Sequence, residues 1–362
     1  MNRRRLLFSL AIVAILVLAV LLILPKWDLY KSGQLTTVNK DEVSFYILKE
    51  TNLEQLASEL KKKGIIEDTE SFIDVGEYKN LSAKKIALGK YIIAPNTKIK
   101  DLLNGFKINS KGNGNAEVEV KVTFSSCRGF QQLEQMSTKV SGSIQLDSAL
   151  LMDYLNDPET MEHYGFSKEE FPAMFIPNTY KMFYDTDEKA FTERMAREYK
   201  RFWNAERMTQ LRNLGLNTPS QLYTLASIVY SEQSRIGEEW PVISKLYLNR
   251  LDSGEKLQSD PTFKFCWGNE LDHVQRLLYE HRDIDCEYNT YKNLGLPPGP
   301  ICLVSSQVLN AVLNPVDVDY IFMCAKADYS GRHNFTKSYR EHALNARRFQ
   351  NWISEELKNK SK

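Results

Sequence analysis

The residue best suited to chemistry is Glu232, in the stretch LASIVYSEQSR at residues 225–235. Apolar residues recur before it at the spacing of one helical face: Leu222, Leu225, Ala226 and Val229. At about 100° per residue, Glu232 falls roughly 20° from Leu225, so it points with the apolar face. Burial and the partial negative charge of a helix carboxyl end both raise the pKa of a carboxyl group. Such a group can stay protonated near neutral pH, as a general acid must.

The same pattern is compatible with a purely structural glutamate. Glu232 can pair with Arg235 or Arg250, or it can face water at the end of its helix. The spacing alone does not separate these alternatives from a catalytic role.

Further polar and aromatic residues gather in loop-prone sequence downstream. Asp260 and Thr262 lie in LQSDPT, and Asn289 and Tyr291 lie in YNTY. We expect Asp260 to orient the substrate or Glu232, with the capping of a turn as an equal alternative. We also expect Thr262, Asn289 and Tyr291 to contact the substrate, because polar loop residues beside a catalytic helix commonly build sites. For Asn289 and Tyr291 the alternative is a satisfied loop with a core aromatic.

Three more residues are candidates for substrate contacts. Tyr180 ends the stretch FIPNTY, and its main alternative is core packing. His333 and Phe335, in GRHNFTKSYREH, are expected to line a cleft, although a lone histidine is as often a structural donor. His333 and His342 do not have a metal-binding spacing, so we expect no metal ion, and we expect no cofactor.

The helix that carries Glu232 has a well-defined start. In NTPSQ, Thr218 can cap the helix, Pro219 suits its first position and Gln221 completes a capping box. Residues 42–108 form a small unit that precedes this region, with strand patterns in EVSFYIL and LGKYII and helical patterns in NLEQLASELKKKGII and TKIKDLLNGF.

The glycine-rich and asparagine-rich segment 109–117 predicts a hinge or hairpin loop after that small unit. From residue 118 to 358, strands and helices alternate, with long helices expected near 129–140, 146–155 and 188–214. The predicted fold class is therefore α+β, with a small domain followed by a mixed α/β domain.

The amino terminus has the pattern of a membrane anchor. Residues 6–24 form an apolar run without charges, which at about 1.5 Å per residue spans roughly the hydrocarbon core of a bilayer. The preceding arginines favour a cytoplasmic amino terminus, which places everything after Pro25 on the other side. The run lacks a small-x-small site before Trp27, which argues for an uncleaved anchor over a cleaved signal or a lipid-attached form. Residues 26–41 read as a polar linker.

Composition excludes some partners and leaves others open. The formal net charge is only +1 and no nucleic-acid module is recognisable, so we expect no nucleic-acid partner. The five cysteines include no C-x-x-C pair, which disfavours a zinc site. Cys266 and Cys286 can pair in an oxidising compartment, but buried structural thiols are the favoured interpretation.

Several of these motifs, in this order, resemble the YceG-like family of endolytic murein transglycosylases. The resemblance rests on LASIV with its following glutamate, NRL with LQSDPT, YNTY with GLPPGPI, H-x-F near the carboxyl end, and FIPNTY upstream. It covers about residues 42–356 and implies a single-pass anchor, a LysM-like module at 42–108 and a catalytic domain at 118–358. Two positions depart from the family pattern, where glutamates are replaced by Tyr230 and by Arg128 before Gly129.

The resemblance implies cleavage of peptidoglycan glycan strands between N-acetylmuramic acid and N-acetylglucosamine without water. The substrate's own C6 hydroxyl attacks C1 and leaves a 1,6-anhydromuramoyl end, with Glu232 matching the family's catalytic acid and base. Asn289 and Tyr291 would then bind sugars. The implied biology is termination of nascent strands near membrane-bound synthases, at the periplasmic face of the inner membrane. Two alternatives remain: a membrane-anchored peptidoglycan-binding protein without catalysis, and a hydrolytic muramidase that uses water with Asp260 as second carboxylate.

Overall fold

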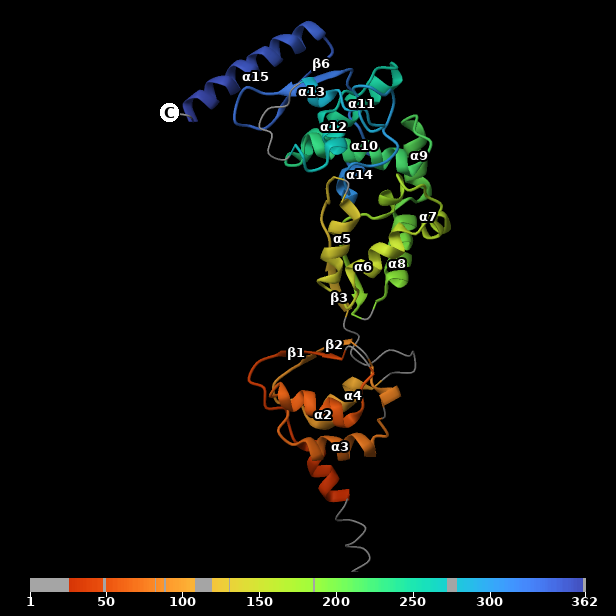
Figure 1. The fold of residues 1–362 in the computed structure, drawn as a ribbon, viewed down its shortest axis with the longest axis vertical. Coiled ribbons are helices and arrows are strands. Elements are labelled where there is room, and N and C mark those ends of the chain that lie inside the picture. The colour runs from red at the N-terminus through yellow and green to blue at the C-terminus, as the bar shows by residue number, and fades with distance from the viewer. Residues whose placement is uncertain are drawn as a thin grey trace, which may run out of the picture. The chain divides into compact units, whose positions relative to one another are not determined.

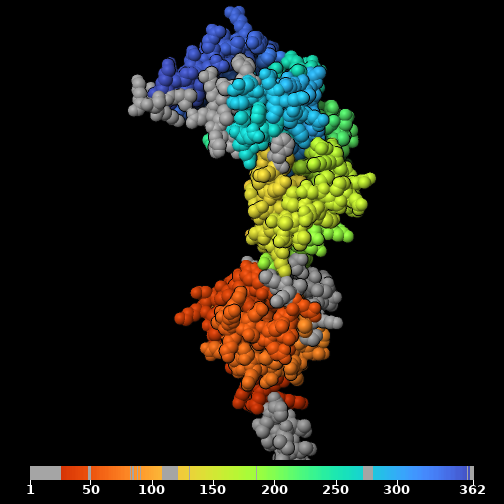
Figure 2. Space-filling model, in the orientation of Figure 1, coloured from red at the N-terminus to blue at the C-terminus, as the bar shows by residue number. Residues whose placement is uncertain are grey.

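The computed structural model describes residues 26–47, 50–81, 83–87, 89–107, 119–129, 131–184, 186–271 and 279–360. The predicted membrane segment at 6–24 and the predicted hinge at 109–117 lie outside these residues. Within the described ranges, no helix is both long and apolar enough to cross a membrane. The chain divides into two compact units: Met1–Val120 with Lys181–Asp185, and Lys121–Tyr180 with Thr186–Lys362 (Figure 1). Figure 2 shows the same units with all their atoms.

The first unit is built on a two-stranded antiparallel sheet. Strand β1 (Val43–Ile47) pairs with β2 (Gly89–Ile93), with Val43 opposite Ile93. Residues 26–34 are helical, and the further helical elements are α2 (Leu53–Lys62), α3 (Thr69–Tyr78), η1 (Ala83–Lys85) and α4 (Ile99–Phe106). Their apolar side chains form one buried cluster, which includes Phe45, Leu56, Leu60, Phe72 and Phe106. The strands and two of the helices were predicted from the sequence; the LysM-like character of the unit stays a prediction.

From residue 119 on, the chain is mainly helical, with two short two-stranded sheets; residues 119–120 and 181–183 of the first of these sheets belong to the first unit. Strand β3 (Glu119–Thr123) pairs with β4 (Thr179–Phe183), and β5 (Phe322–Ala325) pairs antiparallel with β6 (His333–Thr336). The helical elements are α5 (Gln132–Ser141), α6 (Ser148–Asn156), α7 (Pro158–Tyr164), η2 (Phe171–Met174), α8 (Glu188–Phe202), α9 (Ala205–Asn213), α10 (Pro219–Glu232), η3 (Gly237–Glu239), α11 (Trp240–Asp252), α12 (Asp260–Trp267), α13 (Tyr279–Arg282), α14 (Ser306–Leu313) and α15 (Tyr339–Lys360). The fold is therefore mixed α+β, as predicted.

One helix prediction was too long. The segment 188–214 forms two helices, α8 and α9, because the chain leaves the helical conformation at Trp203 and Asn204. The side chain of Asn204 accepts a hydrogen bond from the backbone N–H of Arg207 and caps the second helix. The prediction of one helix over 188–214 did not take account of Asn204 as a helix cap within the segment.

Helix α10 is the centre of the second unit. The predicted capping box of Thr218 and Gln221 is present, with Pro219 in the first helical position. Every side chain from Leu222 to Val229 is at most 2% exposed, and the helix packs against α9, α11, α12 and α14. The prediction of a single apolar stripe was thus too narrow, because the helix is buried on all its faces until its last turn. That turn ends at Glu232, whose side chain contacts Tyr247 of α11 and Ser259, the residue before α12.

Candidate active site

Glu232 is the last residue of α10 and is half-buried. Its Oε1 accepts two hydrogen bonds, from the hydroxyl of Tyr247 at 2.7 Å and from the hydroxyl of Ser259 at 2.5 Å. Tyr247 comes from the middle of α11, and Ser259 immediately precedes α12. Both donors are buried. Within the described residues no hydrogen bond reaches the other carboxyl oxygen, Oε2, so this oxygen is the one available to exchange a proton.

The surroundings raise the pKa of Glu232. Burial is the largest effect, and the nearby negative charge of Asp260 acts in the same direction. The hydrogen bonds from Ser259 and Tyr247 and the proximity of His333 act against it. Burial also holds the pKa of Tyr247 well above its usual value, so this hydroxyl remains a neutral donor. The net result agrees with the predicted direction and suits a carboxyl group that must carry a proton near neutral pH.

A second hydrogen-bond network ties the end of α10 to β6. The amide of Gln233, the residue after Glu232, donates to Glu239 Oε2 at 3.0 Å and to the carbonyl of Gly331 at 2.9 Å. His333 binds the same carboxylate, through its backbone N–H to Oε1 at 2.9 Å and its ring Nδ1 to Oε2 at 2.8 Å. Burial alone would raise the pKa of Glu239, but these hydrogen bonds outweigh it and lower that pKa. His333 thus lies near Glu232, with its orientation fixed by Glu239.

Asp260 forms a group with Tyr291 and Arg282 beside the candidate acid. The Tyr291 hydroxyl donates to Asp260 Oδ1 at 2.5 Å, and an Arg282 guanidinium nitrogen lies 3.6 Å from the same oxygen. The guanidinium carbon is 4.8 Å from the centre of the Tyr291 ring. The structure therefore brings Asp260, Tyr291 and His333 to the surroundings of Glu232; the substrate contacts expected of them stay a prediction.

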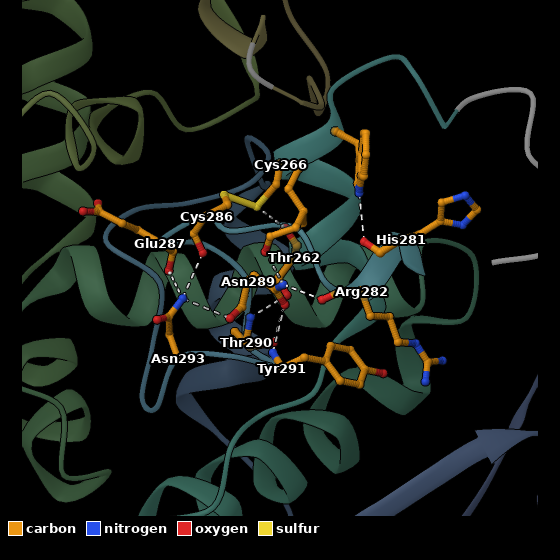
Figure 3. The surroundings of a disulfide bond; sticks show 12 residues. Thr262, Cys266, His281, Arg282, Cys286, Glu287, Asn289, Thr290, Tyr291 and Asn293 are labelled. Carbon is orange, nitrogen blue, oxygen red and sulfur yellow. Dashed lines mark hydrogen bonds between the residues drawn. A yellow bond between two sulfur atoms is a disulfide. The ribbon is translucent and has the colours of Figure 1, made fainter. Parts of the chain in front are cut away.

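Thr262 and Asn289 are buried more deeply than Asp260, Arg282 and Tyr291. Both are fully buried, and their polar atoms bond within the chain. The Asn289 amide donates to the carbonyls of Arg282 and Ile284 at 2.8 and 2.9 Å, and its oxygen accepts from the Tyr291 N–H at 3.0 Å. Figure 3 shows these side chains packed next to a disulfide between Cys266 and Cys286. Neither residue reaches a surface that a sugar could touch. Their hydrogen bonds instead hold the backbone around the site in place.

Tyr180 and Phe335 also pack into the protein. Tyr180 is 6% exposed, donates to the carbonyl of Ile176 and has its ring centre 5.8 Å from that of Phe124. Phe335 stacks with Tyr320 at 6.0 Å between ring centres and lies against the core around α10. For Tyr180 this is the core packing that the sequence left open as its alternative role.

The structural alternative for Glu232, pairing with an arginine, does not occur within the described residues. Arg250 donates instead to the carbonyls of Lys256 and Ile321 and to the side chain of Gln258, each at 2.8 Å. Arg235 is exposed, and within the described residues it forms no ion pair with Glu232. The groups that donate hydrogen bonds to Glu232 are the neutral hydroxyls of Tyr247 and Ser259. Among these three side chains, only the Glu232 carboxyl group therefore changes its charge when it gains or loses a proton.

The two departures from the family pattern lie next to each other. The guanidinium carbon of Arg128 is 5.6 Å from the ring centre of Tyr230, within range of a cation–π interaction. Residue 128 also forms a backbone bridge with Cys302, whose sulfur lies 3.5 Å from the Ser231 hydroxyl. The two substitutions are thus coupled in space, beside the last turn of α10.

Cysteine pairing was left open by the sequence, and the structure resolves it. Cys266 and Cys286 are joined in a disulfide. Cys127 and Cys302 are buried free thiols, and Cys324 is a half-buried one. The interpretation as buried thiols therefore holds for only two of the five cysteines, Cys127 and Cys302. Over the part of the chain that the structure describes, no group of three or more His, Cys, Asp or Glu side chains is arranged to hold a metal ion.

Comparison with known proteins places this chain among relatives of one family. The YceG-like family model matches residues 45–348. The chain is 27% identical over 333 residues to the endolytic murein transglycosylase of Bacillus subtilis strain 168, covering 87% of each chain. It is 23% identical over 331 residues to the protein of the same name from Streptococcus pneumoniae strain D39, covering 85% of this chain and 58% of that one.

A crystal structure of a YceG-like protein from Listeria monocytogenes has the same fold. The superposition has a TM-score of 0.52 at 21% identity and covers 84% of this chain and 99% of the other. The family match spans most of the chain and includes the whole of the site around Glu232. The chain therefore belongs to the YceG-like family.

Proposed function

We propose that this chain is an endolytic lytic transglycosylase that cleaves peptidoglycan glycan strands between N-acetylmuramic acid and N-acetylglucosamine and leaves 1,6-anhydromuramoyl ends. The observation that carries the proposal is the Glu232 carboxyl group, half-buried, with a raised pKa and one oxygen fixed by two neutral donors. The names of the Bacillus and Streptococcus relatives support the same reaction.

One carboxyl group suffices for this chemistry. In the first half, protonated Glu232 donates its proton to the glycosidic oxygen as the bond to C1 breaks. In the second half, the Glu232 carboxylate takes the proton of the C6 hydroxyl as that oxygen bonds to C1. The group is protonated again at the end, so the cycle closes without water.

The hydrolytic alternative requires a second free carboxylate to activate water. Asp260 is the nearest candidate, but its Oδ1 already accepts from Tyr291 and faces Arg282. Those contacts favour a different role for Asp260, in which its negative charge is held at a fixed position near Glu232. The non-catalytic alternative, a peptidoglycan-binding protein, gives no reason for the raised pKa of Glu232.

The proposed location is the periplasmic side of the inner membrane, anchored by residues 6–24 with the amino terminus in the cytoplasm. The apolar run and its preceding arginines support this topology. The Cys266–Cys286 disulfide also supports it, because structural disulfides persist mainly in oxidising compartments. From this position the enzyme would act on strands close to the membrane-bound synthases, with the LysM-like module contacting the glycan.

Analysis of the products tests the proposal. Glycan strands digested with the purified protein and separated by mass spectrometry should carry anhydro ends, whereas a hydrolase gives reducing ends and a binding protein gives no cleavage. The Glu232→Gln variant should lower the rate by about 10²–10⁴-fold, the usual contribution of a general acid or base. Cleavage at the wild-type rate by a folded Glu232→Gln variant would exclude this assignment.

A further inference from the structure

Ser259 is held more tightly than its position in a loop suggests. Its backbone N–H donates to the Thr290 hydroxyl at 3.0 Å, and its carbonyl accepts from the Thr262 hydroxyl at 2.6 Å. The preceding residue, Gln258, has φ of 53°, a backbone conformation that residues other than glycine rarely adopt. Gln258 is fixed there by a hydrogen bond from the Arg250 guanidinium to its side-chain oxygen at 2.8 Å and by its own N–H, which donates to the Thr290 carbonyl at 3.2 Å. The Ser259 hydroxyl is thus aimed at Glu232 by contacts on both sides.

The two threonines join two separate segments of the chain. Thr262 lies in the first turn of α12, and Thr290 lies in the YNTY loop. Their hydroxyls are 2.8 Å apart, and the Thr290 N–H donates to the Thr262 hydroxyl at 3.2 Å. Both side chains are at most 1% exposed. The Ser259 backbone therefore bonds to both sides of this junction.

The disulfide closes the same junction covalently. Cys266 follows Thr262 by one helical turn, and its sulfur lies 3.4 Å from the Thr262 carbonyl. The carbonyl of Cys286 accepts from the Asn289 N–H at 3.0 Å and from the Asn293 amide at 2.9 Å, both within the YNTY loop region. Figure 3 shows Cys266, Cys286, Thr262 and Thr290 gathered in one cluster. The covalent bond and the hydroxyl pair thus brace the same two segments.

We propose that Thr262, Thr290 and the Cys266–Cys286 disulfide are positioning residues for the candidate acid, because they hold the Ser259 hydroxyl on Glu232 Oε1. The inference rests on the proposed function for its effect on rate. Its effect on the carboxyl group itself is independent of that function. Opening the disulfide should loosen the junction, lengthen the Ser259 hydrogen bond and disturb the proton carried by Glu232.

The sign of that disturbance follows from the groups around Glu232. These are Ser259, Tyr247 on α11, Asp260 on α12, Tyr291 in the loop and His333 on β6. The Ser259 hydrogen bond lowers the pKa of Glu232, so its loss raises that pKa. Asp260 moves with the same segments and its departure would lower the pKa, but its effect is smaller than that of Ser259. As long as the burial of Glu232, the largest effect on its pKa, is unchanged, the net change in that pKa is upward.

The direct test measures the Glu232 pKa by carboxyl ¹³C NMR in the oxidised protein and after dithiothreitol treatment. Dithiothreitol supplies two electrons and two protons, which convert the disulfide to two thiols while the reagent becomes a cyclic disulfide. We expect the Glu232 pKa to rise, kcat to fall about tenfold as the acid loses its fixed geometry, and the alkaline limb of the pH–rate profile to move to higher pH. The far-ultraviolet circular dichroism should not change.

Two variants control for thiol chemistry and for folding. The double variant Cys266→Ser/Cys286→Ser should reproduce the reduced protein and no longer respond to dithiothreitol, whereas Cys324→Ser should respond like the wild type. Thr290→Val removes the hydroxyl without changing the volume and should shift the Glu232 pKa in the same direction. Thr290→Ser keeps the hydroxyl and should restore the wild-type value.

An unchanged Glu232 pKa after complete reduction, confirmed by thiol counting, would overturn the inference even if anhydro products still formed. A raised pKa in a protein that releases no anhydro products would support the inference and reject the proposed function. The two failures are therefore distinguishable.

Discussion

The hydroxyl of Tyr247, fifteen residues beyond Glu232 and on the next long helix, donates to Glu232 Oε1 at 2.7 Å. The tyrosine ring belongs to the apolar core around α10, so the donor cannot move without disturbing that core. The candidate catalytic carboxyl group, at the half-buried end of its helix, is thereby fixed by a rigid element. Tyr247 thereby gives the acid one donor that does not depend on the loop that carries Ser259.

Tyr247→Phe should slow cleavage and move the alkaline limb of the pH–rate profile to higher pH. The hydrogen bond from Tyr247 stabilises the charged carboxylate and lowers the pKa of Glu232, so its removal raises that pKa. The acid then stays protonated to higher pH. Rates measured on purified strands across the pH range check this. Tyr199→Phe, a change at a half-buried tyrosine that contacts Trp203 and Phe166, should leave the limb in place. A downward shift for Tyr247→Phe would contradict the assignment.

Asp260→Asn should move the same limb in the opposite direction. The negative charge of Asp260 raises the pKa of Glu232, so neutralising it lowers that pKa and the acid loses its proton at lower pH. The products should still carry anhydro ends. Asp285→Asn removes an exposed charge before Cys286 and is the matched control, with no shift expected. Complete loss of activity in Asp260→Asn would instead favour the hydrolytic mechanism, in which that carboxylate activates water.

The helix that carries Glu232 was predictable because its signals are local. Thr218, Pro219 and Gln221 mark its start within four residues, and the apolar spacing continues to Val229. The direction of the Glu232 pKa shift followed from burial and needed no partner. The spacing did not reveal that α10 is buried on every face, because Ser227 and Thr224 look polar but are buried, with the Ser227 hydroxyl donating to the Thr224 carbonyl.

The partners of Glu232 could not be predicted, because they come from other segments. Tyr247 reads as one more core aromatic in the pattern of α11, and Ser259 is a small polar residue in a loop. Only the fold brings them to one carboxyl oxygen. Asn289 shows the reverse case: a polar loop residue in a recognisable motif bonds the backbone of Arg282 and Ile284 and faces the interior.

Tyr223→Phe should destabilise the second unit by about 1–3 kcal/mol, the usual cost of leaving buried polar groups unpaired. The Tyr223 hydroxyl donates to the carbonyl of Phe175 at 2.8 Å and accepts from the N–H of Val304 at 3.0 Å, so it links three distant segments. Burial holds its pKa well above the usual value, and the hydroxyl therefore stays neutral.

Urea unfolding followed by tryptophan fluorescence checks this, because four of the five tryptophans lie in the second unit: Trp203, Trp240, Trp267 and Trp352. Tyr78→Phe, at a side chain that is 74% exposed in the first unit, is the matched control and should not change the midpoint. Equal midpoints for Tyr223→Phe and the wild type would show that the hydroxyl bonds contribute nothing net.

Glu239→Gln should destabilise the protein at neutral pH and do so progressively less in acid. The hydrogen bonds from His333 and Gln233 lower the pKa of Glu239 in the folded state below its ordinary value of 4.5. Because the unfolded state binds this proton more tightly, the carboxylate contributes stability above about pH 4.5, and that contribution disappears as the pH falls through the folded-state pKa. The difference in unfolding free energy between variant and wild type should therefore narrow from pH 7 towards pH 3.5.

Glu238→Gln, which changes a neighbouring exposed carboxylate, should show no comparable narrowing of that difference. A difference that stays constant with pH would mean that Glu239 acts through shape and packing, and that its charge does not hold His333 beside the acid.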